Sequence, residues 1–386
     1  MELDSAAVHA GRADLAGLGV HAPPIDLSST YPLPDLDAAV AALDALGAGA
    51  PEAETPVYAR LHNPTTRRVE LALAELEGTP DAVAFASGMA ALTACLLAAC
   101  GERRHAVGVR PLYGGSDHLV SCGLLGIDVT WVVGSDEIGA AVRDGTGLLL
   151  LETPQNPTLG QVDIAQVVAA AGGVPVLVDN TFATPVLQNP ARHGASLVLH
   201  SATKFLGGHG DIVAGVVACD PDWAARLRQV RILTGALLHP LAAYLLHRSL
   251  PTLPFRVREA QERARVLAGL LADHPAVTRV LYPQPDGAQL RGPGAVLAFE
   301  VEGGLPAAAA VMANVRLITP AVSLGAVDTL IEHPAGLTHR LVDPTVREAA
   351  GITDGLLRLS VGLEDVHDLW HDLDRAIAAS RIRAAA

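Results

Sequence analysis

Short apolar runs alternate with segments of helical spacing through the middle of the chain. Six runs have the length of strands, and each is followed by a turn of Gly, Ser, Thr, Asn or Pro: DAVAFAS, HAVGVR, DVTWVV, GLLLLE, VPVLVDN and SLVLHS. Between them, segments such as residues 65–77 and 88–100 repeat apolar side chains at helical spacing. Strands that are buried on both faces and joined by helices predict an α/β fold with a mainly parallel sheet flanked by helices.

The two ends of the chain follow other patterns. The N-terminal segment combines short apolar pieces, one helical run and the loop GAGAPEAETP, so we expect an arm rather than a domain. After residue 235, the strand-like runs AVLAFEV and LLRLSV stand among several helical segments. We therefore predict an N-terminal arm over residues 1–55, a sheet domain over residues 56–235 and a smaller C-terminal α+β domain over residues 236–386.

Charge and hydropathy exclude two classes of partner. The 386-residue chain has a formal net charge of -14, which argues against a nucleic acid because phosphate binding needs a basic face. Its uninterrupted apolar stretches, such as residues 148–151, are far shorter than the roughly 20 residues that span a bilayer. Acidic residues stand near the start of the sequence, where a secretory signal would carry basic ones. We expect no nucleic-acid or membrane partner and a cytoplasmic location.

The side chains that most often bind metals do not show the spacing of a metal site. His367 and His371 would share a helix face, but a third ligand is lacking, so we interpret them as a solvated or packing face. We expect no bound metal. The four cysteines follow neither disulfide nor metal-ligand spacing, and we expect buried, reduced thiols at Cys95, Cys100, Cys122 and Cys219.

One residue is unusual because it is the only lysine in the chain. Lysine and arginine together number 27, of which 26 are arginine, and the remaining residue is Lys204 in SLVLHSATKFLGGHGD. A guanidinium stays protonated, whereas a desolvated amine can lose its proton and condense with a carbonyl. Drift from lysine to arginine in a GC-rich gene would also leave one lysine by accident, more often in a polar surface helix. Lys204 is therefore a candidate for amine chemistry.

Other polar residues follow the strand-like runs, at the sheet edge where α/β folds bind ligands. The turn FASGMAAL offers Ser87 as a helix cap, and the N–H groups of residues 88–90 would point at an anion. Asp179 ends an apolar strand, where a carboxylate caps, binds a cation or holds a protonated ring nitrogen. Each of these residues alone is equally an ordinary turn former. Further amide and hydroxyl groups follow two runs, at Asn156, Ser201 and Thr203.

Arg358 is the cation that most needs an explanation. It lies inside the apolar run LLRLSV, where an unpaired guanidinium would be costly. Its partner is either a structural Asp or Glu or an anionic ligand. The residue pattern leaves both alternatives open.

Together these motifs resemble the Cys/Met-metabolism family of pyridoxal-phosphate (PLP) enzymes, the γ-synthases, γ- and β-lyases and sulfhydrylases of transsulfuration. The similarity extends from VHAG and PPI near the N-terminus to LSVGLED near the C-terminus. It implies the type I fold of PLP-dependent transferases, which agrees with the predicted α/β sheet. Several of the matching segments are long: YARLHNPT, ASGMAAL, LYGGSDHL, ETPQNPT, VDNTFATPVLQNP, HSATKFLGGHGD and SLGAVDTLIEHPAGLTH.

The resemblance implies that pyridoxal 5'-phosphate is the cofactor and that Lys204 is the amine that holds it. Asp179 would face the pyridine nitrogen and keep it protonated. Tyr113 would stack on the ring, and Asn156 would meet its phenolic oxygen. Lys204, once freed by the substrate amine, would act as a base beside the Cα proton, with Tyr113 as its partner in proton transfer. The phosphate would be held by Gly88, Met89, Ser201 and Thr203.

The same resemblance implies residues for the substrate and for a second subunit. Arg358, assisted by Ser323 and Asn156, would clamp the substrate carboxylate. Tyr58 and Arg60 would reach the phosphate of the neighbouring subunit. A homodimer would therefore be the minimum catalytic unit, and a homotetramer is usual in the family.

Three positions depart from the family's patterns and bear on the reaction. Val322 stands where enzymes acting on cystathionine commonly carry Glu, which favours an uncharged substrate side chain. Gly115 replaces the Cys that is usual in methionine γ-lyases, and Gly210 replaces a common Ser. We predict a C–S γ-lyase that converts cystathionine, homocysteine or methionine to a thiol, ammonia and 2-oxobutanoate. The alternatives are γ-replacement on an activated homoserine ester and a non-catalytic PLP-fold binding protein.

Overall fold

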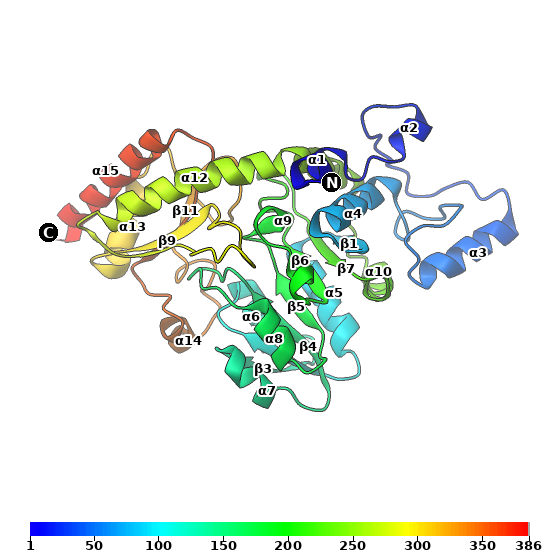
Figure 1. Ribbon diagram of the computed structural model, residues 1–386, viewed down its shortest axis with the longest axis horizontal. Coiled ribbons are helices and arrows are strands. Elements are labelled where there is room, and N and C mark those ends of the chain that lie inside the picture. Colours follow the sequence, from blue (N-terminus) through cyan, green and yellow to red (C-terminus); the bar gives the residue numbers. More distant parts are fainter. Residues whose placement is uncertain (385–386) are drawn as a thin grey trace.

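A computed structural model of the protein, which describes residues 1–384, contains two β-sheets (Figure 1). The larger sheet has seven strands in the order β1-β7-β6-β5-β4-β2-β3. Its strands are β1 Asp81–Phe85, β2 His105–Val109, β3 Asp128–Val132, β4 Thr146–Glu152, β5 Val176–Asp179, β6 Leu197–His200 and β7 Gly215–Cys219.

Six of these seven strands run in the same direction. β6, β5, β4, β2 and β3 pair in parallel, and β1 shares their direction because both β1 and β6 pair antiparallel with β7. The predicted mainly parallel sheet is confirmed, and all six predicted strands are present. The alternation of strand and helix does not predict β7, because no helix separates β7 from β6. The chain returns through a loop instead, so β7 runs antiparallel.

Helices cover both faces of the larger sheet. On β4, Leu149 packs in a core that includes residues of α4 (Pro64–Glu77), whereas its neighbour Leu150 packs in a core that includes residues of α5 (Gly88–Cys100). Successive side chains of a strand point to opposite faces, so an uninterrupted apolar run is what a sheet covered on both faces requires. The helices predicted over residues 65–77 and 88–100 are confirmed.

The ends of α4 show why the sequence places a helix there. The side chain of Asn63 accepts the N–H groups of Thr65 and Thr66, and Pro64 occupies the first helical position. Gly78 ends the helix in the left-handed conformation, with φ 72°.

The second sheet has five strands in the order β10-β11-β12-β9-β8 and lies in the C-terminal part of the chain. Helix α12 (Leu253–Ala272) leads into it, and α13 (Gly304–Asn314) and α15 (Val366–Ala384) pack with it in one core. The expected smaller C-terminal α+β part is confirmed, whereas domain boundaries at residues 55 and 235 stay predictions. The strands of this second sheet are β8 Val277–Leu281, β9 Val296–Val301, β10 Thr319–Pro320, β11 Leu330–Glu332 and β12 Leu356–Ser360.

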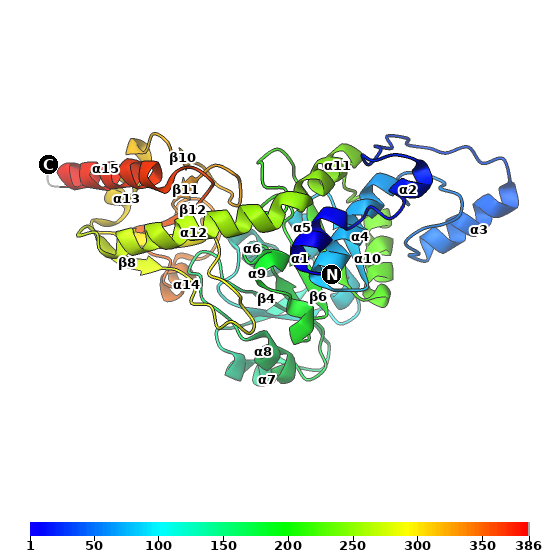
Figure 2. The same cartoon turned by 45° about the horizontal axis from the view of Figure 1, so that its top comes forward.

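The N-terminal segment extends from the body of the molecule. Helix α3 (Leu36–Gly47) and the C-terminal helix α15 lie at opposite ends of the molecule in both views (Figures 1 and 2). The first helix, α1 (Leu3–His9), contributes Ala6 and Ala7 to the main core, so the arm is anchored at its start. The remaining α-helices are α2 Leu15–Leu18, α6 Gly114–Ser121, α7 Ile138–Ala141, α8 Ile164–Ala170, α9 Thr184–Leu187, α10 Pro221–Thr234, α11 Pro240–Ser249 and α14 Pro344–Ala349.

Three further features bear on the expectations from sequence. Over residues 1–384, none of the helices combines the length and the apolar character needed to cross a membrane. All four cysteines are free and three are buried, but Cys122 is exposed at the end of the short helix α6, so the expectation of a buried thiol is wrong there. His367 and His371 are exposed on α15, and the described part of the chain has no group of three potential metal ligands.

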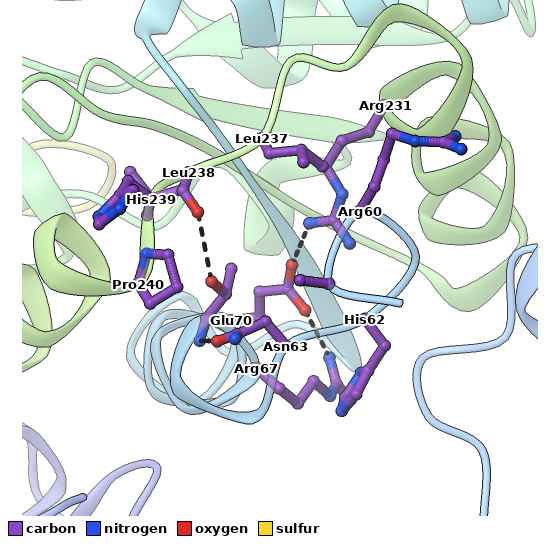
Figure 3. Close-up of a pocket in the computed structure, with 12 residues that line it drawn as sticks. Arg60, His62, Asn63, Arg67, Glu70, Arg231, Leu237, Leu238, His239 and Pro240 are labelled. Carbon is purple, nitrogen blue, oxygen red and sulfur yellow. Dashed lines mark hydrogen bonds and ion pairs between the residues drawn. The ribbon is translucent and has the colours of Figure 1, made fainter. Parts of the chain in front are cut away.

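A buried cluster of ion pairs joins α4, β1 and α10. Glu70 accepts from Arg231 Nη1 at 2.5 Å and from Arg67 Nη1 at 3.4 Å. Asp81 accepts from Arg67 Nη1 at 2.7 Å and from Arg228 Nη2 at 2.6 Å. Figure 3 shows the Glu70 carboxylate between the guanidinium groups of Arg67 and Arg231. Arg228 and Arg231 are buried with their partners and Arg67 is partly buried, so losing one carboxylate would leave uncompensated charge.

We expect Glu70→Ala to lower the free energy of unfolding at pH 7 by about 3 kcal/mol, because the buried guanidinium of Arg231 would lose its carboxylate partner, whereas Arg67 keeps Asp81. Burial raises the pKa of Glu70, but Arg231, Arg228 and Arg67 outweigh it and hold that pKa below its usual 4.5. The stabilisation is therefore complete above pH 4.5 and is lost as the pH falls below that value. Urea unfolding of wild type and variant at pH 7 and pH 4 measures both effects.

A matched control for this prediction is Glu262→Ala, which removes an exposed i,i+3 partner of Arg265. We expect little change in the unfolding free energy from this variant, because exposed ion pairs are screened. Equal losses in the two variants would contradict the account of the buried cluster.

Candidate active site

The carboxyl ends of β1, β2, β4, β5 and β6 share one edge of the larger sheet, and a pocket of about 540 Å³ lies there. The C-terminal part of the chain closes its other side with Val322, Ser323 and Arg358. Eleven of the thirteen predicted site residues line this pocket: Gly88, Met89, Tyr113, Asn156, Asp179, Ser201, Thr203, Lys204, Val322, Ser323 and Arg358.

The start of α5 forms one wall of the pocket. Ser87 Oγ accepts the N–H of Ala90 at 3.0 Å, so the predicted cap is confirmed and one of the three expected anion donors is occupied. The N–H groups of Gly88 and Met89 begin the same helix. A Cβ on Gly88 would lie 3.0 Å from the Cβ of Ser201, so only glycine lets the helix start approach the strand end this closely. Helix N-termini of this kind bind phosphate.

Hydrogen bonds to the backbone and to Thr181 fix the segment Ser201–Thr203. The hydroxyl of Thr203 donates to the carbonyl oxygen of Ala214 at 3.2 Å and accepts the N–H of the same residue at 3.0 Å. The N–H of Ser201 donates to Thr181 Oγ1 at 2.8 Å. The loop between β6 and β7 is therefore held in one conformation before it reaches Lys204.

Asp179 is a partly buried carboxyl at the end of β5. Its Oδ1 accepts from the Thr181 hydroxyl at 2.5 Å and from the Thr181 N–H at 3.0 Å. Burial raises the pKa of Asp179 above its ordinary value, although Thr181, His200 and Lys204 act in the opposite direction. A carboxyl in this state gains from a cationic group in hydrogen-bond contact, such as a protonated ring nitrogen.

Lys204 lines the pocket beside the C-terminal part of the chain. Its Nζ donates to Ser323 Oγ at 2.7 Å. Burial, helped by the nearby guanidinium of Arg358, lowers the pKa of Lys204 from 10.5 to about 8, while Glu332 and Asp179 act against this shift. A substantial fraction of the amine is therefore neutral close to pH 8, as condensation with a carbonyl requires.

Arg358 is held by groups from both parts of the chain and is only 2% exposed. Its Nη1 donates to Asn156 Oδ1 at 2.9 Å, and its Nη2 donates to the carbonyl oxygen of Ser323 at 2.7 Å and to Glu332 Oε1 at 2.8 Å. The sequence left either a structural carboxylate or an anionic ligand as the partner of Arg358. The structure supplies the carboxylate, which is that of Glu332. Within the described residues, Arg358 Nε is buried without a hydrogen-bond partner, so the guanidinium retains a donor for a further anion.

Three of the polar residues that sequence reasoning missed hold other groups of this site in place. Glu152 lines the pocket at the end of β4, Thr181 bridges Asp179 to the backbone of Ser201, and Glu332 pairs with Arg358 across β11 and β12. Glu152 ends an apolar strand in the same way as Asp179, so its position at the strand end could have identified it from the sequence. Glu332 also ends a short strand, but its pairing with β12 is not readable from the sequence.

Two predicted residues, Tyr58 and Arg60, do not line the Lys204 pocket of their own chain. Arg60 lies beside a separate cavity of about 180 Å³ with His62 and Arg231, as Figure 3 shows. Its Nη1 donates to the carbonyl oxygen of Ile232 at 2.9 Å, and its guanidinium lies 5.7 Å from the ring centroid of Tyr58. Tyr58 is 44% exposed. This placement agrees with residues that would act outside their own subunit.

The residues of the Lys204 pocket fit pyridoxal 5'-phosphate. The partly buried amine of Lys204 has a lowered pKa, the Asp179 carboxyl lacks an ion-pair partner among the described residues, and the helix start at Gly88 and Met89 lines the pocket. The unpartnered Nε of Arg358 adds a donor for a carboxylate. An aldehyde, a ring nitrogen, a phosphate and a substrate carboxylate therefore each have a matching group in the pocket.

Comparison with known proteins identifies the family. The model of the Cys/Met metabolism PLP-dependent enzymes matches residues 4–378. The chain belongs to this family. The L-methionine gamma-lyase of Streptomyces avermitilis is 60% identical over 385 residues, which cover 98% of this chain and 90% of that protein. The L-methionine gamma-lyase of Brevibacterium sandarakinum is 54% identical over 395 residues and covers 100% of this chain and 99% of its own length.

Among solved structures, cystathionine gamma synthase from Xanthomonas oryzae pv. oryzae is 35% identical, with a TM-score of 0.90 over 99% of each chain. The expected type I fold of PLP-dependent enzymes is therefore confirmed. This member of the Cys/Met metabolism family is a PLP-dependent carbon–sulfur γ-lyase, and its cofactor is pyridoxal 5'-phosphate.

We expect Lys204 in the cofactor-free protein to react with an acylating reagent at a rate that rises with pH around a midpoint near 8. Burial and the Arg358 guanidinium lower the pKa of the amine, so an ordinary midpoint of 10.5 would contradict the site electrostatics. Peptide mass spectrometry reads the modification at this single lysine and separates it from the N-terminal amine. Arg358→Met should move the midpoint upward, because it removes a neighbouring positive charge.

Proposed function

We propose that the enzyme cleaves methionine-like thioethers, with release of a thiol, ammonia and 2-oxobutanoate on net consumption of one water. The observation that carries this proposal is an apolar rim around the Lys204 pocket. Four large apolar side chains line the pocket and are nonetheless 45–66% exposed: Val213, Val322, Leu337 and Leu341. A bound alkyl side chain would remove such surface from water, which is favourable. The names of the two relatives at 60% and 54% identity support the same substrate class.

The distribution of charge supports an uncharged substrate side chain. The carboxyl groups that line the pocket, those of Glu152 and Asp179, lie at strand ends rather than at the rim. The second ammonium of cystathionine would meet Val322 instead of a carboxylate. Burying an unpaired ammonium is costly, so the rim disfavours that substrate.

The proposed roles follow the geometry of the pocket. PLP, when bound, supplies an electron sink for the substrate's Cα carbanion. Lys204 holds the cofactor and then moves the Cα proton, for which its lowered pKa suits it. Asp179 would face the ring nitrogen, and Tyr113 and Asn156 would contact the ring from two loops. The phosphate would be held by Gly88, Met89, Ser201 and Thr203, and the hydroxyl of Thr203 would bind it while also bonded to the backbone of Ala214.

The substrate carboxylate is assigned to Arg358, with Ser323 and Asn156 beside it. The unpartnered Nε–H of the guanidinium supports this role, because it is a buried donor that no described residue satisfies. Ser323 holds a φ of 89°, an unusual value for a residue other than glycine, and contacts both Lys204 and Arg358. Such local strain is often found at functional sites.

We also propose a homodimer as the minimum catalytic unit, with a homotetramer as the assembled enzyme and a cytoplasmic location. Tyr58 and Arg60 would complete the phosphate site of the neighbouring subunit. Neither residue lines the Lys204 pocket of its own chain, which supports this arrangement. Exposed apolar side chains on the arm, including Leu36, Val40 and Leu43 on one side of α3, support contact with a second copy.

Turnover of single amino acids tests the proposed reaction. With L-methionine, L-homocysteine or L-cystathionine as the only substrate, we expect 2-oxobutanoate from methionine with a kcat/KM at least about tenfold above that for cystathionine, because the rim lacks a carboxylate. Val322→Glu should narrow this ratio, whereas Val322→Gln, similar in size but uncharged, should not. If no substrate gave a 2-oxo acid without an added thiol, the γ-replacement alternative would be favoured.

Hybrid subunits test the shared site. Lys204→Ala and Arg60→Ala subunits, each of low activity alone, should on co-expression recover up to about a quarter of the wild-type activity, because hybrid dimers contain one intact site. The matched control pairs Arg60→Ala with Tyr58→Ala, which leaves every site with a defective partner residue. Equal activity of the two mixtures would contradict site sharing.

A further inference from the structure

Glu152 is a buried carboxyl that joins two loops of the pocket. It is the last residue of β4 and is 3% exposed. Its Oε2 accepts the backbone N–H of Tyr113 at 2.7 Å, and a hydrogen bond from the backbone of Asn156 acts on the same carboxyl. Tyr113 follows β2 and Asn156 follows β4, so the two residues lie on separate loops. Glu152 therefore fixes the backbone of both loops at the residues that contact the ring in the proposed function.

His339 holds the same two loops from the C-terminal part of the chain. Its Nε2 lies 3.2 Å from the carbonyl oxygen of Leu112 and 3.2 Å from that of Asn156. Burial, with a contribution from Arg358, lowers the pKa of His339 to about 4, so the ring is neutral near pH 7. A neutral ring with its proton on Nε2 serves both carbonyls. The loops are thus fixed through their N–H groups by Glu152 and through their carbonyl oxygens by His339.

The surroundings of Glu152 favour its uncharged form. Glu152 and Asp179 are direct register partners on the parallel strands β4 and β5. No Lys, Arg or His of the described residues lies within ion-pair distance of Glu152. Burial and the Asp179 carboxylate raise the pKa of Glu152 well above 4.5, although the Tyr113 N–H and Arg358 oppose this shift. Two adjacent buried carboxyls do not both ionise readily.

We propose that Glu152 is a positioning residue that, as an uncharged acid, holds Tyr113 and Asn156 at the ring and leaves Asp179 as the one charged carboxylate of the pair. This inference rests on the proposed function, in which Tyr113 and Asn156 contact the cofactor. A neutral carboxyl accepts the N–H of Tyr113 through its oxygen without adding a second negative charge beside Asp179. The Asp179 charge is then free to pair with the ring nitrogen.

The test compares Glu152→Gln, which keeps a neutral acceptor, with Glu152→Met, which fills the space without one. Apoprotein is titrated with pyridoxal 5'-phosphate at pH 6 to 9, and the visible circular dichroism of the bound cofactor reports how the ring is held. Tyr113→Ala serves as the reference for a lost ring contact. Asp372→Ala is the structural control, because Asp372 also accepts backbone N–H groups but lies outside the pocket.

We expect Glu152→Met to weaken cofactor binding by about tenfold or more and to reduce the visible dichroism, because a buried N–H loses its acceptor. Glu152→Gln should stay within about threefold of wild type over the whole pH range, and Asp372→Ala should lower stability without changing cofactor affinity. Equal losses in the Gln and Met variants, or no loss in either, would overturn the inference. If Glu152→Met does not fold, a loss above tenfold in folded Glu152→Gln overturns it, and affinity within threefold supports it.

These outcomes are distinguishable from a failure of the proposed function. If Tyr113→Ala binds the cofactor with wild-type affinity and dichroism, Tyr113 is not a ring contact and the proposed function fails at that point. If Tyr113→Ala weakens binding while both Glu152 variants behave as wild type, the ring contact stands and only the role of Glu152 is wrong.

Discussion

Two cations with opposite requirements share one pocket, and the site depends on how their surroundings differ. Lys204 needs to lose its proton to react with a carbonyl, so it benefits from burial without a close carboxylate. Its amine is accordingly bonded to the neutral hydroxyl of Ser323. Arg358 cannot lose its proton and needs a counter-charge, which the register of β11 and β12 supplies by placing Glu332 opposite it. Desolvation therefore favours the neutral, reactive amine of Lys204, whereas at Arg358 the Glu332 carboxylate compensates its cost.

The topology of the larger sheet explains how chemistry from distant segments meets. Because six strands share one direction, the segments after five of them reach the same edge, and residues as far apart in sequence as Gly88 and Lys204 line one pocket. β7 is the exception, and its reversed direction lets the loop that bears Lys204 turn back beside β6. The C-terminal part then closes the pocket with Ser323 and Arg358, so both parts of the chain are needed for a complete site.

Much of this arrangement could be predicted from the sequence, because burial on both faces of a sheet leaves uninterrupted apolar runs and the family motifs mark the strand ends. The missed features depend on pairing between distant segments. Glu332 is recognisable as a partner only once β11 lies beside β12, and β7 follows a loop rather than a helix. Thr181 acts through a hydroxyl that links Asp179 to Ser201, a contact that no local pattern encodes. Cys122 is exposed because α6 ends at the surface. The sequence around Cys122 does not show where this helix ends.

Val322 and Gly115 depart from the family pattern in ways that favour different substrates, and they lie at different parts of the pocket. Val322 belongs to the exposed apolar rim, where a substrate side chain would end. Gly115 lies beneath the ring of Tyr113, and a Cβ there would be 2.5 Å from Tyr113 Cε1, so any side chain would displace that ring. Gly210 has a φ of 68° and open space around it, so its backbone conformation alone favours glycine. The side chain at position 322 therefore bears on charge at the rim, whereas the residue at position 115 bears on the placement of the Tyr113 ring, and the two positions act separately.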